Sequence, residues 1–187
     1  MAQIFVSHSR KDGNIRDFFD RAFAGSSVKA VRVEFEEAPE PASQYIAQQI
    51  KFSDAIFVLL GPNIVGSSYT QNWVAFEIGL AAAYEYAKHI WVFEPKQYEG
   101  LDFPVPFLHH FVVYDLYSEE DFRYIQDIVR AYEPILPIFR NIPRGYDITC
   151  PYEDCQSSYI LHAKTQRFYC PVCRRPVELT NEPLTEG

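Results

Sequence analysis

The chain has 187 residues, of which 48% are hydrophobic and 16% aromatic, and its formal net charge is −8. This length exceeds one typical domain but falls short of two, and so apolar a composition excludes a disordered chain. The negative charge argues against nucleic acid and anionic membrane surfaces as partners.

The chain shows neither a secretory signal nor a membrane span. Its first residues, MAQIFVSHS, lack the basic segment and the cleavage site of a signal peptide, so we expect a cytoplasmic protein. The most apolar region, Val74 to Ala87, contains Glu77 and Glu85, and no apolar stretch reaches membrane-spanning length. We therefore expect no membrane partner.

The first part of the chain predicts alternating strands and helices. Ile4 to Val6 is a short apolar run, and a stretch with apolar residues at helical spacing follows Asp12. Val28 to Phe35, rich in Val, predicts a second strand. Ser43 is expected to cap a helix from Gln44 to Phe52.

The alternation continues through the middle of the chain. Ala55 to Leu60 is a continuous apolar run, typical of a parallel strand buried on both faces. A polar loop, Gly61 to Gln71, is expected before a helix from Asn72 to Ala87. His89 to Phe93 and Phe111 to Leu116 predict the fourth and fifth strands.

A capped helix completes the pattern, because Ser118 and Asp121 fit a helix start that leads to about Tyr132. Five strand–helix repeats predict an α/β fold of the flavodoxin-like kind with a five-stranded parallel sheet. Ligands bind such sheets at the carboxyl ends of the strands, so we expect a site near Ser7 to Ser9 and the loop after Leu60.

Prolines after this helix predict a change of domain. We expect a first domain over residues 1–135, a linker over 136–147, a small four-cysteine domain over 148–180 and a tail over 181–187.

The four cysteines form two closely spaced pairs, Cys150-x4-Cys155 and Cys170-x2-Cys173, separated by 14 residues. Four thiolates at such spacings can close a tetrahedral zinc shell, with each pair projecting from one tight turn. The segment resembles a zinc ribbon, so we expect a structural Zn²⁺ bound by Cys150, Cys155, Cys170 and Cys173. So small a domain could hardly fold without metal, and replacing Cys170 or Cys173 with Ser is expected to unfold it while the helices of the first domain persist.

Two alternatives to this site remain. His162 could replace one thiolate, or the Cys170-Pro-Val-Cys173 motif could serve redox chemistry, although such a motif normally stands alone at a helix start. A closed structural site needs no catalytic role. What the ribbon contacts stays open.

Residues 1–135 resemble the Toll/interleukin-1 receptor (TIR) family, especially the compact microbial members of Thoeris-type antiphage defence. The motifs are Ile4-Phe5-Val6-Ser7-His8-Ser9, the early Asp12, the apolar third strand, and Asn72-Trp73-Val74-Ala75-Phe76-Glu77, which matches the W-x-x-x-E pattern of the family. Two departures are His8, where many members carry Tyr, and the short segment Glu36 to Pro41 in place of a longer contact loop of animal adaptors.

The resemblance implies an NAD glycohydrolase or cyclase that splits the nicotinamide–ribose bond, with Glu77 as the catalytic carboxylate. It also implies that Trp73 supports this helix face and that four residues approach the substrate: Phe5, Ser7, His8 and Ser9. From the residues alone, Glu77 is conspicuous because a carboxylate among apolar helix residues lines a polar cleft, finds a partner or marks the solvent side. Arg10 and Lys11 could meet the pyrophosphate or lie solvated in a loop.

The resemblance further implies self-association through the TIR-like domain and an activator or a downstream effector protein. The sequence does not choose between hydrolysis and formation of a cyclic ADP-ribose signal. The rival function is a non-catalytic interaction module. A phospho-acceptor receiver domain is disfavoured, because the strand Ala55 to Leu60 runs into Gly61 without a terminal aspartate.

Overall fold

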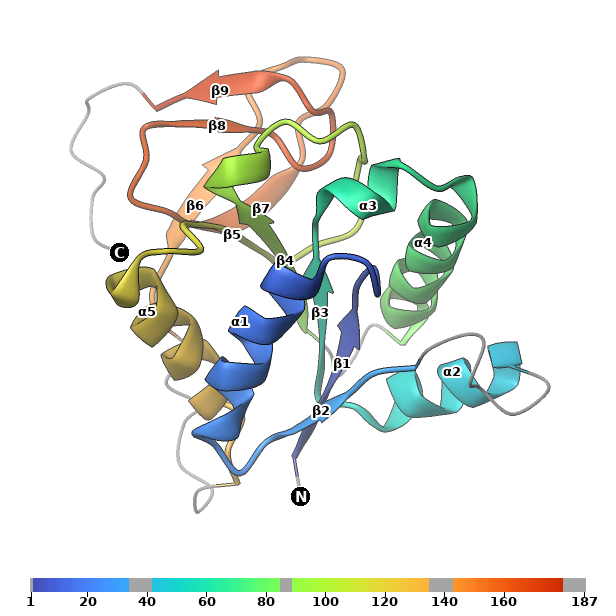
Figure 1. Cartoon of the computed structure of the whole chain (residues 1–187). Coiled ribbons are helices and arrows are strands. Elements are labelled where there is room, and N and C mark those ends of the chain that lie inside the picture. Colours follow the sequence, from blue (N-terminus) through green and yellow to red (C-terminus); the bar gives the residue numbers. More distant parts are fainter. Residues whose placement is uncertain (1, 34–41, 85–88, 135–142, 180–187) are drawn as a thin grey trace.

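The computed structural model is an α/β fold in which helices cover a mostly parallel seven-stranded sheet (Figure 1). It describes residues 2–33, 42–84, 89–134 and 143–179. Within these ranges, no helix combines the length and the apolar character needed to cross a membrane.

The secondary-structure elements alternate through the first two thirds of the chain. The strands are β1 (Gln3–Ser7), β2 (Lys29–Val31), β3 (Ala55–Leu59), β4 (His89–Pro95), β5 (His110–Tyr114), β6 (Tyr146–Thr149), β7 (Ser158–His162), β8 (Arg167–Tyr169) and β9 (Pro176–Glu178). The helices are α1 (Gly13–Ala24), α2 (Ala42–Phe52), α3 (Pro62–Val65), α4 (Ser68–Ala83), α5 (Glu119–Arg130) and the 3-10 turn η2 (Lys96–Tyr98).

The main sheet has the order β2-β1-β3-β4-β5-β7-β6, and β8 and β9 form a separate two-stranded sheet. The α/β class and the largely parallel sheet are confirmed, but the expected strand count of five is wrong. Strand β7 of the cysteine-rich segment pairs in parallel with β5, and β6 pairs antiparallel with β7. Without β7, β5 would be an edge strand with unpaired backbone groups, and this addition satisfies them.

Two local expectations also need correction, and others concern residues that the structure does not describe. Ser43 lies inside α2, which begins at Ala42, so it is not the residue before the helix. The expected loop Gly61 to Gln71 contains α3 and the first turn of α4, because Ser67 caps α4 by accepting a hydrogen bond from the Thr70 backbone N–H at 3.3 Å. The segment Glu36 to Pro41 and the tail 181–187 lie outside the described residues, as does most of the expected linker.

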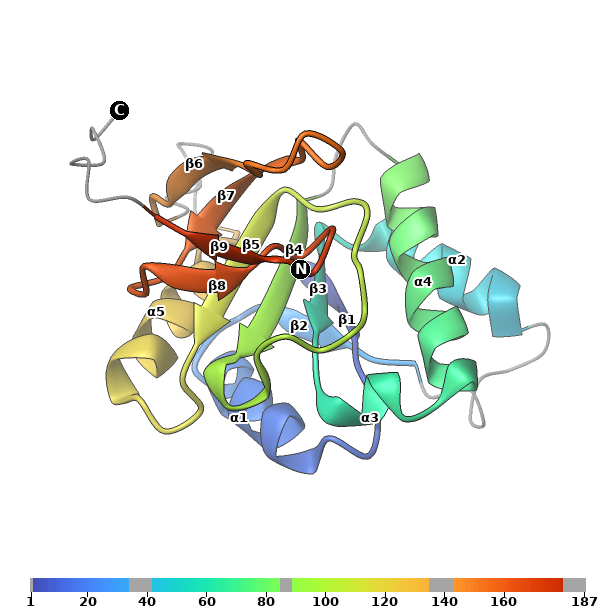
Figure 2. The ribbon, with the colours of Figure 1, turned by 90° about the horizontal axis from the view of Figure 1, so that it is seen from above.

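The sheet separates two apolar layers (Figure 2). Ile4 and Val6 of β1 face the side covered by α1 and α5, whereas Phe5 packs with residues of α2 and α4. Side chains alternate along a strand, so Ser7 shares the side of Phe5. The β8–β9 hairpin contributes Phe168 to that second core layer. This arrangement places the carboxyl end of β1 beside α4.

A histidine-rich network lies where β4, β5 and β7 meet α5. The His110 ring stacks on Trp91 with 3.8 Å between ring centroids, and its Nδ1 lies 3.0 Å from Nε2 of His162. The Tyr124 hydroxyl lies 2.6 Å from Nδ1 of His162. Burial and, to a lesser extent, the neighbouring histidines lower the pKa of His110 to about 3. Burial lowers the pKa of His162 to about 4. Both rings are therefore neutral at pH 7.

Acidification from pH 7 to pH 5 is expected to lower the free energy of unfolding, by on the order of 2 kcal/mol for each of His110 and His162. Their pKa values in the folded chain lie below the unfolded value, so the unfolded chain takes up protons first as pH falls through about 6.5. The stabilisation is present above that pH and is lost progressively towards the folded pKa. Urea unfolding at several pH values measures the loss, and ring-proton NMR assigns it. A His162 ring that titrates near pH 6.5 in the folded protein would contradict the prediction.

Candidate functional site

Glu77 lies in the middle of α4 on the side that faces the sheet. It is 7% exposed, so it does not mark the solvent side of the helix. Ser7, the last residue of β1, donates its hydroxyl to Oε2 of Glu77 at 2.5 Å. Such a short hydrogen bond suits an ionised acceptor, and a buried carboxylate needs partners of this kind. Two residues 70 positions apart in the chain thus form one polar centre.

A pocket of about 100 Å³ opens beside this carboxylate, where the carboxyl end of β1 meets α2 and α4. It brings together four residues that the resemblance marks: His8, Ser9, Trp73 and Glu77. Its other lining residues are Arg10, Val33, Ile46, Tyr69, Thr70 and Val74. The pocket thus lies at the carboxyl end of β1, but neither Ser7 nor the loop directly after Leu60 lines it.

Phe5 does not line this pocket. It is 1% exposed and packs in the core beneath the site, because its side chain enters the apolar layer between the sheet, α2 and α4. Trp73 borders the pocket, and its ring meets Phe76 edge-on with 5.4 Å between centroids. Phe5 is therefore a core residue, while Trp73 forms part of the pocket wall.

His8 and Arg10 are the other titratable residues of the pocket that lie in the loop after β1. Burial, with the nearby Arg32 guanidinium adding to it, lowers the pKa of His8 to about 4, so this ring is neutral at pH 7. Its Nδ1 lies 3.3 Å from the Val6 carbonyl oxygen. Arg10 lines the pocket and Lys11 does not, so Arg10 is the cationic side chain placed to meet an anionic part of a ligand.

Asp12 holds the loop after β3 against the start of α1. It is buried, and Oδ1 accepts a hydrogen bond from the Asn63 side-chain amide at 2.6 Å. A Cβ at Gly61 would stand 2.3 Å from Oδ2 of Asp12, so only glycine allows this approach. Asp12 is therefore a structural residue that does not line the pocket.

The four cysteines form a second centre. Their ligand atoms all lie within 4.8 Å of one another. The Sγ–Sγ distances are 3.8 Å for Cys150 and Cys173 and 4.0 Å for Cys155 and Cys170. Zn–S bonds of about 2.3 Å in a tetrahedron put sulfurs about 3.8 Å apart, whereas a disulfide needs about 2.05 Å. The geometry fits a metal ion such as zinc.

Two equivalent turns present these thiols. One turn, Cys150 to Cys155, joins β6 to β7, and the other, Cys170 to Cys173, joins β8 to β9. The residue after each turn has a positive φ, 44° for Gln156 and 57° for Arg174. The Gln156 N–H donates to the Tyr152 carbonyl oxygen at 3.0 Å, and the Arg174 N–H donates to the Cys170 carbonyl oxygen at 2.9 Å. A bound ion would clamp the small sheet to the large one.

The chemistry of the thiols favours a cation at their centre. Burial raises the pKa of the Cys150 thiol to about 12, so a thiolate there needs a compensating positive charge. His162 does not belong to this cluster, because its two ring nitrogens engage Tyr124 and His110. The four sulfurs alone could therefore hold such an ion.

A buried ion pair that sequence reasoning missed links the cysteine turns to the sheet. The Arg174 guanidinium donates to both carboxylate oxygens of Glu94, at 2.5 and 3.2 Å, and the Gly100 N–H also donates to Glu94 at 3.0 Å. The side chains are 8% and 2% exposed. A glutamate directly after the apolar run of β4 could have indicated a buried charge in the sequence. No local pattern identifies its partner, which lies 80 residues later in the chain.

Replacing Arg174 with Met is expected to lower the free energy of unfolding by about 3–5 kcal/mol, because it leaves the Glu94 carboxylate buried without its cation. Arg167→Met is the matched control, since Arg167 pairs with Glu178 at the surface and exposed pairs contribute about 1 kcal/mol or less. Urea unfolding of metal-saturated protein measures both. An equal loss of unfolding free energy in the two variants would show that the buried pair stabilises the fold no more than an exposed pair does.

No protein-family model matches this chain, and no curated protein sequence is similar to it, so the function rests on the site itself.

Proposed function

We propose that this chain is a TIR-type NAD glycohydrolase or cyclase that cleaves the nicotinamide–ribose bond, with Glu77 as its catalytic carboxylate. The observation that carries the proposal is the buried Glu77 side chain, which borders a pocket at the carboxyl end of β1 and accepts a 2.5 Å hydrogen bond from Ser7. A solvated helix residue would have neither feature. The resemblance in residues 1–135 supplies the reaction.

The chemistry needs a fixed negative charge. When the bond between C1′ of the ribose and the nicotinamide nitrogen breaks, the bonding electrons leave with neutral nicotinamide and positive charge develops on the ribose. The Glu77 carboxylate stabilises that charge more in the transition state than in the substrate. The Ser7 hydroxyl holds one carboxylate oxygen in place, which keeps the charge preorganised.

The attacking group decides the product. If the oxygen of water bonds to C1′, ADP-ribose forms and one proton is released to solvent. If a nucleophilic atom of the same ADP-ribose bonds to C1′, a cyclic product forms instead. Both routes use the same carboxylate, so the proposal covers both.

The size of the pocket fits a partial site. Its volume of about 100 Å³ is below the roughly 300–1,000 Å³ of complete small-molecule sites, so one ring of the dinucleotide fills it. The remainder would extend past Arg10 and Trp73 at the rim. A second copy of the chain would complete the enclosure, in keeping with the self-association that the resemblance implies.

The direct test is incubation of concentrated protein with NAD, followed by chromatographic separation of the products. Release of nicotinamide with ADP-ribose or a cyclic isomer supports the proposal. No nicotinamide from protein that is demonstrably assembled would favour an interaction module. The exposed aromatic residues Tyr69 and Phe76, at 49% and 38% exposure on α4, would suit such a role.

The cysteine centre has a structural part in this proposal. A zinc ion held by the four thiolates would join the β8–β9 hairpin to the main sheet. Such a closed site leaves no coordination position for substrate. An activator or an effector protein would then contact the outer surface of this segment.

A further inference from the structure

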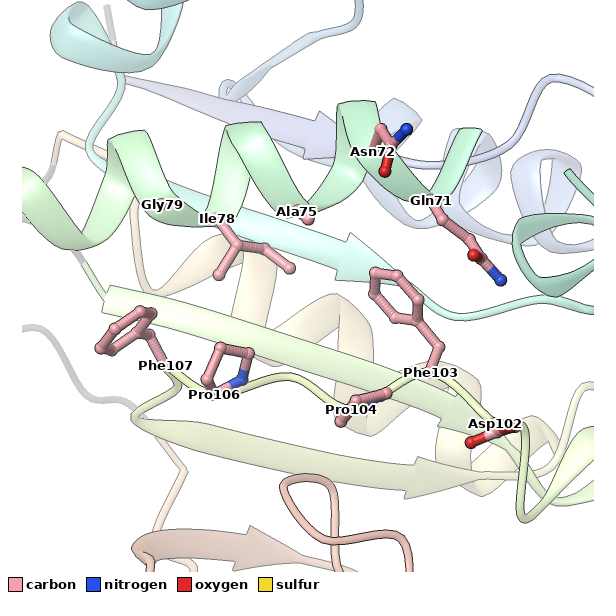
Figure 3. A pocket seen from close by; sticks show the side chains of 10 residues that line it. All are labelled: Gln71, Asn72, Ala75, Ile78, Gly79, Asp102, Phe103, Pro104, Pro106 and Phe107. Atoms are coloured by element: carbon pink, nitrogen blue, oxygen red, sulfur yellow. The ribbon is translucent and has the colours of Figure 1, made fainter. Parts of the chain in front are cut away.

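A second pocket, of about 320 Å³, lies between α4 and the segment 102–107 (Figure 3). Its lining residues are Gln71, Asn72, Ala75, Ile78, Gly79, Asp102, Phe103, Pro104, Pro106 and Phe107. None of them lines the pocket at Glu77, and Ile78 is the next residue along α4 from Glu77. The volume falls within the range of about 300–1,000 Å³ that small-molecule sites occupy.

Gly79 keeps one end of this pocket open. Glycine inside a helix costs about 1 kcal/mol relative to alanine. A Cβ built at Gly79 meets nothing within 4 Å, so the packing of this chain does not require glycine there. Because Gly79 is part of the pocket lining, a larger side chain there would take up space at this end of the pocket. The described residues thus leave open space beside Gly79 at this end of the pocket.

The two ends of the pocket differ in polarity. Gly79 lies at the same end as Phe107 and Pro106, whereas Gln71 and Asp102 lie at the opposite end (Figure 3). The apolar end and the middle, where Ile78 projects from α4, offer no hydrogen-bonding side chain. A ligand that fits this pocket carries its polar group at one end.

The polar end offers acceptors and negative charge. The Gln71 amide NH2 group donates one hydrogen bond to the Val65 carbonyl oxygen at 3.2 Å, so its second N–H and its oxygen can each face a ligand. Asp102 is the single charged residue among those that line the pocket. The amides of Gln71 and Asn72 can donate as well as accept, so the negative charge of Asp102 is what favours a cation and disfavours carboxylates and phosphates.

We propose that this pocket binds a compact amphipathic cation, with a primary ammonium group at Gln71 and Asp102 and an aromatic or branched aliphatic body along Ile78 towards Phe107. Burial of the body against apolar side chains supplies most of the affinity. Asp102 is exposed, so it selects the head group and contributes modestly to affinity. The site is independent of NAD cleavage.

The test uses phenethylamine as the probe, with phenylethanol and phenylacetate as neutral and anionic analogues, in protein-detected NMR titrations. Phenethylamine is expected to bind about 5-fold more tightly than the alcohol and about 10-fold more tightly than phenylacetate, with shifts confined to the lining residues. Asp102→Asn is expected to remove the preference for the amine while keeping alcohol binding. Equal affinities in wild type, or no shifts at millimolar probe, would overturn the proposal.

A filling variant tests the location. Gly79→Leu is expected to weaken phenethylamine binding by at least about 10-fold while the helix keeps or gains stability. The matched control is Ala83→Leu, which adds a leucine to the same helix one turn further on, outside the lining, and is expected to bind as wild type does. Gly79→Ala, which nothing within 4 Å opposes, is the second variant, with a partial loss expected. Unchanged binding in both Gly79 variants would place the probe elsewhere.

Discussion

Replacing Glu77 with Gln is expected to slow the release of nicotinamide from NAD by about 100-fold or more, with the fold retained. Glutamine keeps the shape of the side chain and can still accept a hydrogen bond from Ser7, which now lies 2.5 Å from Oε2. What disappears is the negative charge that stabilises the ribose cation. Initial rates of nicotinamide release, compared at equal protein concentration, measure the effect.

The control for this experiment is Glu119→Gln, the same chemical change at an exposed position in the first turn of α5. Its rate is expected to match that of wild type. Both variants are compared with wild-type protein in its active, assembled state, and thermal unfolding verifies that Glu77→Gln is folded. If folded Glu77→Gln released nicotinamide as fast as wild type, Glu77 would have no part in the reaction.

Replacing Cys173 with Ser is expected to abolish stoichiometric zinc binding and to lower the melting temperature by about 10 °C or more. Zinc binding stabilises small cysteine sites by about 10–16 kcal/mol, and a two-stranded sheet such as β8–β9 is marginal by itself. Arg174 follows Cys173 directly, so loss of the turn also releases the buried Glu94 carboxylate from its partner. Metal analysis and thermal unfolding by circular dichroism measure the two effects.

The structure makes this effect larger than the sequence suggests. Phe168 of β8 packs against Phe111 of β5, with 6.2 Å between ring centroids, and the Val105 N–H donates to the Pro171 carbonyl oxygen at 2.8 Å. Loss of the metal therefore weakens the core of the main sheet as well as the cysteine segment. The helices α1 and α5, on the opposite face, are expected to persist.

Ser157→Ala is the control for the cysteine experiment. It removes a hydroxyl that lies 3.1 Å from Sγ of Cys155 and leaves all four thiols in place. Zinc content is expected to stay near one per chain, with a small change in melting temperature. Wild-type protein without metal, or a Cys150–Cys173 disulfide in freshly isolated protein, would contradict the zinc site.

Much of the candidate site follows from local sequence. The apolar run Ile4 to Val6 ends at Ser7. Ligand sites of parallel sheets lie at the carboxyl ends of the strands, so the position of the pocket was predictable. Trp73 and Glu77 are one helical turn apart, which puts them on one side of α4. Phe5 was misplaced, because position in a motif does not say which residues of an alternating strand reach the cavity.

The sequence by itself determined the alternation of elements and the chemistry of the cysteines. Apolar runs such as Ala55 to Leu60 predict burial on both faces, and the spacing of Cys170 and Cys173 predicts a turn that could hold a metal ion. Each pattern depends only on residues that are neighbours in the chain.

Only the tertiary structure decided which distant segments meet. The pairing of β7 with β5, the hydrogen bond from Ser7 to Glu77 and the ion pair of Arg174 with Glu94 all join residues far apart in the chain. Strand β7 presents the same backbone donors and acceptors to the edge of any sheet, so its sequence does not predict which strand it pairs with. The buried polar pairs also leave no pattern in the local sequence. Burial makes these interactions strong, and burial arises only when the chain has folded.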